Sequence, residues 1–256
     1  MLVTSVNVGL IRPLVIGNGT SAAATASHTS AAAAASDTSA AAAASARSDD
    51  AEKLAKTVPS AIGKQPVLGP VEVGSLGLVG DQIGEPQHHG GEGQAVYAYS
   101  TQDYAYWESA LGIALPPATF GENLTVDGFL STECNVGDEW GFPGGLRLQV
   151  TCPRIPCNKL TAVMGRLTGS DQAFAPIFAN ARRPGVYLRV LQTGPIGAGD
   201  EIVVTPLGDN DPVSVIELMD AYYDPRYPAD RIRHILAAPI DPRGRAMFTD
   251  RLERRR

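Results

Sequence analysis

Short apolar runs separated by glycine and proline constrain the fold of this chain more than any other feature. Residues 65–81, QPVLGPVEVGSLGLVGD, repeat such runs, and residues 3–8 alternate. Residues 95–100, AVYAYS, are rich in aromatic and branched side chains. These patterns are typical of strands bounded by turns. Further strands are predicted over residues 136–140, 146–151, 186–192 and 201–205.

Two similar turns support this reading, NVGDEW at residues 135–140 and GAGDEI at 197–202. In both, Gly-Asp can reverse the chain before a new strand. One helix is expected in this part of the chain, with Thr101 as its N-cap and Gly112 as its end. Many short strands and few long helices predict a mainly β fold, a closed or nearly closed barrel with a few short helices.

The pattern changes after Pro206. Ser214 and Glu217 have the spacing of a capping box, and three segments of helical period follow. We therefore expect a β-barrel domain over residues 1–206 and a small α-helical domain over 212–256. Three short helices bury too little surface to be stable alone, so they are expected to pack on the barrel or on another subunit. The basic tail, residues 251–256, is expected to be a solvated helix end.

An Ala/Ser-rich segment interrupts the predicted barrel. Residues 21–53 favour helix through alanine, but serine and threonine weaken that preference and no apolar stripe could dock a helix on a core. We expect a disordered or transiently helical insertion at about residues 18–57, with no functional role. His28 within it is expected to be solvated.

Composition limits the function classes. The chain has 256 residues, 44% of them hydrophobic, and a net charge of −6, which argues against a nucleic-acid polymer or an anionic membrane as partner. Its three cysteines do not form an even disulfide framework, which indicates a reducing compartment. The sequence shows neither a secretory signal nor a strongly apolar stretch of membrane-spanning length. We therefore expect a cytoplasmic protein.

The stretch TCPRIPCNKL, residues 151–160, is the strongest candidate for chemistry. Its two prolines fix backbone angles and aim Cys157 reproducibly, while Arg154 and Lys159 would favour a thiolate. A preset, anionic sulfur suits a nucleophile or a soft-metal ligand. The alternative is a buried thiol that acts as a small hydrophobe, which is the expected role of Cys152 at the end of the predicted strand.

Three further segments are weak indicators when taken singly. HHGGEGQ, residues 88–94, combines glycines that allow a ligand close to the main chain with imidazoles that can donate to an anion or shuttle a proton. FGENL, residues 120–124, places an acid and an amide after a glycine. Arg182 and Arg183 precede a strand and could bind phosphate, although each segment could equally be an ordinary surface turn or a solvated pair.

Taken in order, these segments resemble the MOSC domain family, named for the C-terminal domain of molybdenum-cofactor sulfurases, and in particular its stand-alone YiiM-like subgroup. The similarity covers nearly all of residues 1–206 except the insertion, and the tail resembles the three-helix domain that follows in that subgroup. It is carried by GLVGDQ, HHGGEGQAVYAYSTQDYAYW, FGENLTVDG, NVGDEW, CPRIPCNKL and RRPGVYLRVLQTGPIGAGDEI.

The resemblance implies a β-barrel that binds a molybdopterin-type molybdenum cofactor. It assigns Cys157 as the metal ligand and a catalytic residue, and His89 as a second catalytic residue that donates a proton or contacts the cofactor. The cofactor-binding residues that it implies are Lys64, His89, Gly90, Asn123, Arg154, Lys159 and Arg183. The family is also labelled with pyridoxal phosphate binding, but the resemblance assigns no residue of this chain to it.

The chain departs from the family pattern at three positions. Relatives usually carry lysine where this chain has Gln94, often glutamate where it has Val79, and usually glutamine where it has Cys152. Loss of the lysine removes a cation from the neighbourhood of the glycine turn.

The resemblance also implies an activity, the reduction of N-hydroxylated compounds such as hydroxylamino purines to amines. Electrons would come from a separate reductase, because Cys152 and Cys157 have the first spacing of a plant-type iron–sulfur motif but no cysteine follows them, and no dinucleotide fingerprint follows a strand. The expected partners are this reductase and a small-molecule substrate, with a homodimer as one assembly left open.

Three alternatives remain at this point. The domain could be a non-catalytic carrier of the cofactor or of sulfur, with a persulfide on Cys157. It could be an interaction domain without a cofactor. It could also hold zinc through His88, His89 and Cys157, although these ligands are far apart in sequence and lack a second Cys-x-x-Cys pair.

Overall fold

A computed structural model describes residues 1–16, 56–87, 89–170 and 172–255. The insertion expected at about residues 18–57 lies outside the described residues except for its last two, which begin strand β3 (Lys56–Ser60). None of the helices described combines the length and the apolar character needed to cross a membrane.

The largest element is an eight-stranded sheet in the order β13-β9-β10-β11-β7-β8-β1-β4. Its neighbouring strands are antiparallel except for β7 and β8, which are parallel. The strand bounds are β1 (Leu2–Val8), β4 (Gln65–Pro66), β7 (Val96–Ser100), β8 (Leu124–Asp127), β9 (Glu139–Gly141), β10 (Arg147–Pro153), β11 (Val186–Gln192) and β13 (Val203–Thr205).

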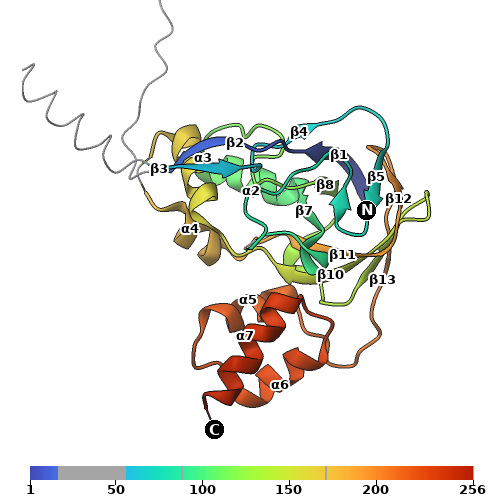
Figure 1. Cartoon of the computed structure of the whole chain (residues 1–256), viewed down its shortest axis with the longest axis vertical. Helices are drawn as coiled ribbons and strands as arrows, with labels where there is room; N and C mark the ends of the chain where they lie inside the picture. The colour runs from blue at the N-terminus through green and yellow to red at the C-terminus, as the bar shows by residue number, and fades with distance from the viewer. Residues whose placement is uncertain (17–55, 88, 171, 256) are drawn as a thin grey trace, which may run out of the picture.

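Strand β1, next to the end strand β4, meets the segment that leads into β13, so that the sheet curls into a nearly closed barrel (Figure 1). The amide of Val3 in β1 donates to the carbonyl of Asp200 (2.9 Å), and the amide of Ile202 donates to that of Met1 (2.8 Å). These bonds connect β1 to the segment that leads into β13. The expected mainly β fold with a few helices is confirmed.

Smaller sheets and short helices surround the barrel. The sheets are β12-β5-β6 and the hairpin β2-β3, and helix α3 contacts β2. The remaining bounds are β2 (Arg12–Ile16), β5 (Val71–Gly74), β6 (Gly77–Leu78), β12 (Gly194–Ile196), η1 (Glu92–Gln94), η2 (Ser131–Glu133), α2 (Thr101–Leu111), α3 (Asn158–Thr168) and α4 (Phe174–Ala181).

Strand β7 separates two cores. Because side chains alternate along a strand, Val96 and Ala98 belong to the aliphatic core, whereas Tyr97 and Tyr99 belong to an aromatic cluster with residues of α2, α3 and α4. In that cluster Trp107 stacks on Phe178 at 5.9 Å between ring centroids. Burial on both faces explains why AVYAYS reads as one continuous apolar strand.

The helix that follows β7 begins one residue earlier than the sequence indicates. Ser100, not Thr101, is the N-cap, and its hydroxyl accepts from the amide of Asp103 (2.9 Å). Ser100 has the extended backbone that an N-cap requires, while the hydroxyl of Thr101 donates to Asp127 (2.6 Å). Gly112 ends the helix as predicted, at a φ of 67°.

Three helices follow the barrel, α5 (Val215–Tyr223), α6 (Ala229–Ala237) and α7 (Pro242–Glu253). They form a separate group beside β10 and β11 (Figure 1). A shared apolar cluster joins them to the barrel; its buried members are Val136, Cys152, Val213, Leu218, Ala221, Ile232, Ile235, Ile240 and Phe248.

Polar contacts complete the helical group. Ser214 accepts from the amide of Glu217 (2.9 Å), which forms half of the predicted capping box, but the Glu217 carboxylate accepts from Arg231 (2.7 Å). Arg251 donates to the carbonyl of Ala221 (2.6 Å). The prediction of a solvated tail is therefore wrong at Arg251, because its hydrogen bond joins α7 to α5.

Candidate functional site

Cys157 lies where strand β10 gives way to helix α3. It is the N-cap of α3 and has an extended backbone, with φ −122° and ψ 169°. Its half-buried side chain lines a cavity of about 90 Å³ that is partly open to solvent. The proline-containing turn thus presents the thiol to a cavity.

The cavity brings together most of the site that the resemblance implies. Six of the seven expected cofactor-binding residues line it together with Cys157: Lys64, His89, Gly90, Asn123, Arg154 and Lys159. Gly90 has a φ of 70°, and a Cβ there would lie 2.1 Å from a methyl carbon of Ile83. A side chain at this position would strain the backbone and press on Ile83, so the turn that carries His89 favours glycine.

The thiol of Cys157 is acidic. Burial raises its pKa. The hydrogen bond with the His89 side chain, the charge of Arg154 and the amide of Leu160 together outweigh burial, and the pKa falls to about 6. Cys157 is therefore mainly a thiolate at neutral pH, the form in which cysteine attacks electrophiles and binds metals.

Arg154 provides a buried cation beside the thiolate. It is only 5% exposed, its Nη1 donates to the carbonyl of Phe120 (2.7 Å), and its guanidinium carbon lies 5.0 Å from the ring centroid of Tyr97. Its buried Nε has no hydrogen-bond partner among the described residues. An unpaired N–H of this kind is what an anionic ligand would satisfy.

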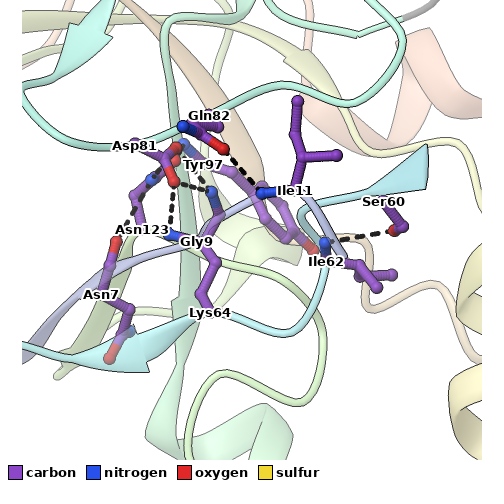
Figure 2. A network of polar contacts seen from close by, with 10 residues as sticks. All are labelled: Asn7, Gly9, Ile11, Ser60, Ile62, Lys64, Asp81, Gln82, Tyr97 and Asn123. Atoms are coloured by element: carbon purple, nitrogen blue, oxygen red, sulfur yellow. Dashed lines mark hydrogen bonds and ion pairs between the residues drawn. The ribbon is translucent and has the colours of Figure 1, made fainter. Parts of the chain in front are cut away.

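Lys64 and Asn123 belong to a polar network around Asp81 (Figure 2). The Nζ of Lys64 lies 2.5 Å from both Asp81 oxygens, and the amide of Asn123 donates to Asp81 Oδ2 (2.8 Å). Asp81 also accepts from the amide of Gly9 (2.7 Å), and Asn123 accepts from that of Tyr97 (3.1 Å). The network joins three segments of the cavity wall.

This network changes the role of Lys64. Burial lowers the pKa of Lys64, and the neighbouring Asp81 carboxylate opposes that shift and neutralises the ammonium. Sequence reasoning did not single out Asp81, although it ends the GLVGD segment that carries part of the resemblance. Lys159 is also paired, with Nζ 3.0 Å from Glu85 and donating to the carbonyl of Pro59 (3.1 Å).

Arg183 is not brought to the cavity. It is absent from the described residues that line it, and its Nη1 lies 2.6 Å from the carboxylate of Asp103. Its guanidinium also lies 4.2 Å from the ring centroid of Tyr106. The expected phosphate contact is thus not supported, because the guanidinium compensates the buried Asp103 carboxylate instead.

A second cavity, of about 310 Å³, adjoins the first. Both are lined by His89, Gln94 and Tyr187. The second is completed by residues of the helical group, so the site is built from two parts of the chain. These residues are Tyr222, Asp241, Arg243, Gly244 and Met247.

Arg243 holds the glycine-rich turn from the side of α7. Its guanidinium donates to the carbonyls of Pro86 (2.9 Å), His89 (3.3 Å) and Gly90 (2.8 Å), and to the side-chain oxygen of Gln94 (3.1 Å). A cation is therefore present beside Gln94, where relatives usually carry lysine. No local pattern in the sequence indicates this contact, because the partners lie about 150 residues apart.

Cys152 contrasts with Cys157. It is 1% exposed, its pKa is raised by burial, and it belongs to the apolar cluster between the barrel and the helices. No group of three His, Cys, Asp or Glu able to hold a metal occurs in the described part of the chain, and His88 of the zinc alternative lies outside that part. Of these two cysteines, Cys157 is the one that lines the cavity and can reach a ligand in it.

The chemistry of these residues fits a metal-bearing, anionic cofactor. A thiolate can bind the metal, and the unpaired Arg154 Nε can bind an anionic oxygen. Gly90 and Gly121, with φ values of 70° and 74°, shape the cavity wall, because the space that a Cβ would take is filled by Ile83 and Ile62.

The fold and the cavity define a β-barrel protein with a thiolate beside a buried arginine in a pocket. Residues 85–203 match the MOSC domain, and the chain belongs to the MOSC domain family. It is 30% identical to the uncharacterized protein YflK of Bacillus subtilis over 60% of this chain and 67% of that protein. It is 35% identical to the protein YiiM of Escherichia coli over 55% of this chain and 61% of that protein.

Solved structures agree with this assignment. The structure of YiiM from Geobacillus stearothermophilus superimposes with a TM-score of 0.67 at 25% identity and covers 98% of each chain. That of YiiM from Escherichia coli gives 0.61 at 25% identity, over 76% of this chain and 90% of that one. A protein named "Reductase" from Gibberella moniliformis is 30% identical over 58% of this chain and 26% of that protein. Membership of the family supports a function associated with the molybdenum cofactor.

Proposed function

We propose that the protein is a molybdenum-cofactor-dependent oxidoreductase that reduces N-hydroxylated compounds, such as hydroxylamino purines, to amines. The observation that carries this proposal is the Cys157 thiolate, which lines a cavity next to His89 and the buried Arg154. The MOSC family and the fungal relative named as a reductase support it.

In this proposal the chain's own residues hold the cofactor. Cys157 would bind the metal through its sulfur, and Arg154 would donate its unpaired Nε–H to an anionic oxygen. Lys159 lies in the same wall, where its charge is paired with Glu85. Lys64 acts chiefly through Asp81 and Asn123, by fixing the shape of the cavity.

The reaction consumes two electrons and two protons for each N–OH group and releases the amine and water. The bound cofactor supplies the two-electron reduction and the site at which oxygen is removed. His89 would deliver a proton to the departing oxygen, because it lines both cavities and its side chain forms a hydrogen bond with Cys157. A separate reductase, in a cytoplasmic setting, would supply the electrons.

Metal analysis tests the ligand assignment. Protein made in molybdenum-replete cells should contain molybdenum and pterin, and Cys157→Ser should lose most of both together with reduction of an N-hydroxylated purine. Cys134→Ser is the matched control, because Cys134 is buried and does not line either cavity. Equal molybdenum in Cys157→Ser would remove Cys157 from the ligand role, and metal-free wild-type protein would overturn the cofactor assignment.

A turnover assay separates this enzyme from a carrier of cofactor or sulfur. With an artificial low-potential electron donor, the molybdenum-loaded protein should convert the N-hydroxylated purine to the amine repeatedly. A carrier would bind the cofactor, or a persulfide on Cys157, without turnover.

A further inference from the structure

The second cavity has walls from two parts of the fold. The barrel contributes His89, Ile155 and Tyr187, and the helices contribute Tyr222 and Met247. Its volume of about 310 Å³ lies at the lower end of the range typical of small-molecule sites, roughly 300–1,000 Å³. It adjoins the Cys157 cavity through His89, so a molecule held there would lie next to the proposed reacting centre.

The wall is suited to a flat aromatic ring. Tyr187 and Tyr222 are both half-buried, so part of each side chain stays accessible. Tyrosine faces favour offset or edge-on contact with another ring. Met247 adds a flexible thioether and Ile155 an aliphatic surface, both of which pack against aromatic rings.

The charged groups in this wall already have hydrogen-bond partners. Asp241, 1% exposed, accepts from the amides of Arg243 (3.1 Å) and Gly244 (3.2 Å) and from the hydroxyl of Tyr222 (3.0 Å). The Arg243 guanidinium donates to oxygens of the glycine-rich turn. A neutral ring with a few polar edges therefore suits this cavity better than an anion does.

We propose that this second cavity binds the aromatic ring of the substrate, and that Tyr222 and Met247 of the helical group determine its specificity for planar N-hydroxylated heteroaromatic compounds. This inference rests on the proposed function for the chemistry of the N–OH group. The helical group is then a part of the substrate site and selects for ring-bearing substrates over small aliphatic ones.

Binding of a ring that cannot react tests the inference directly. Adenine binding to the full-length protein as purified is measured by calorimetry, for the wild type and for Met247→Trp, which fills the cavity. The control is Ala246→Trp, because Ala246 precedes Met247 on α7, is exposed and does not line the cavity. Ile155→Trp fills the same cavity from the barrel side, in case the α7 variant fails to fold. Thermal unfolding checks each variant.

We expect adenine to bind the wild type and Ala246→Trp alike, and at least tenfold more weakly to a folded variant in which the cavity is filled. Failure of the wild type to bind adenine, or equal binding by the filled variants, would overturn the inference. In an active preparation Met247→Trp should raise KM for 6-hydroxylaminopurine at least tenfold more than it raises KM for hydroxylamine. Adenine binding does not need molybdenum. A protein that binds adenine but contains no molybdenum would refute the proposed function and support the ring site. An active protein whose filled variants bind adenine as the wild type does would refute the ring site and support the proposed function.

Discussion

Two cysteines five positions apart have opposite chemistry. Cys152, on β10, is packed between the barrel and the helices, and burial raises its pKa. Cys157 begins α3 at a cavity, and its pKa falls to about 6 despite partial burial, because His89 and Arg154 stabilise the thiolate. The difference shows that burial alone makes a thiol inert, whereas burial beside a hydrogen-bond donor and a cation makes it reactive.

The largest expected effect is in alkylation. At pH 7 iodoacetamide should modify Cys157 at least about 100-fold faster than Cys152 in the folded protein, because the first is mainly thiolate and the second is a protonated thiol out of reach of solvent. Peptide mass spectrometry over a time course measures both rates. Cys134, whose pKa burial raises to about 12, is the internal control and should be as slow as Cys152. Comparable rates for all three would refute the contrast.

The next effect is the pH dependence of the same reaction. The alkylation rate of Cys157 in metal-free protein should rise about tenfold between pH 5 and pH 7, with a midpoint near its folded-state pKa of about 6. A midpoint near the usual thiol value would show that His89 and Arg154 do not act on the sulfur.

The same pKa shift affects stability. Because the folded-state pKa of Cys157 lies below the usual value of 9.0, the unfolded chain binds more protons between those two pH values. The contribution of Cys157 to the free energy of unfolding should be complete above pH 9 and should be lost as pH falls toward 6. Urea unfolding of the wild type and of Cys157→Ser across this range measures it as a difference between the two proteins.

A smaller effect is expected on removal of the histidine partner. His89→Ala should raise the pKa of Cys157 by about one unit, because the hydrogen bond is lost while the Arg154 charge remains. Alkylation at pH 6 should then slow by about fivefold. His234→Ala is the matched control, because His234 lies on α6 and lines neither cavity. Equal slowing in both variants would indicate a general structural effect.

The smallest effect is expected at the inert cysteine. Cys152→Ala removes one buried sulfur from the contact between barrel and helices and should cost about 1 kcal/mol of unfolding free energy. The alkylation rate of Cys157 should stay unchanged. A changed alkylation rate of Cys157 in this variant would mean that the two thiols affect each other.

Much of the fold could be predicted because its signals are local. Alternation and glycine stops mark β7 and the end of α2, and the two prolines around Arg154 mark the turn that carries Cys157. The N-cap of α2 was misplaced by one residue, because Ser100 and Thr101 are both good caps and only the backbone angle decides between them.

The parts of the site that were missed depend on distant partners. Arg183 looked like a phosphate ligand, but nothing in its own segment shows that Asp103 would lie against it. Arg243 reads as one more surface cation of a helix, and its bonds to the turn around Gly90 form only when α7 docks. Motif order thus located the thiol and its histidine, whereas the charge pairing followed from tertiary packing.

The bonds from Arg243 to the glycine-rich turn also affect how the chain can be dissected. Cutting the protein after the last barrel strand would remove three helices and would also release the main-chain oxygens of Pro86, His89 and Gly90 from their donor. A truncated barrel would therefore have a damaged pocket rather than a minimal one, and selection on the pocket would extend to the helical group.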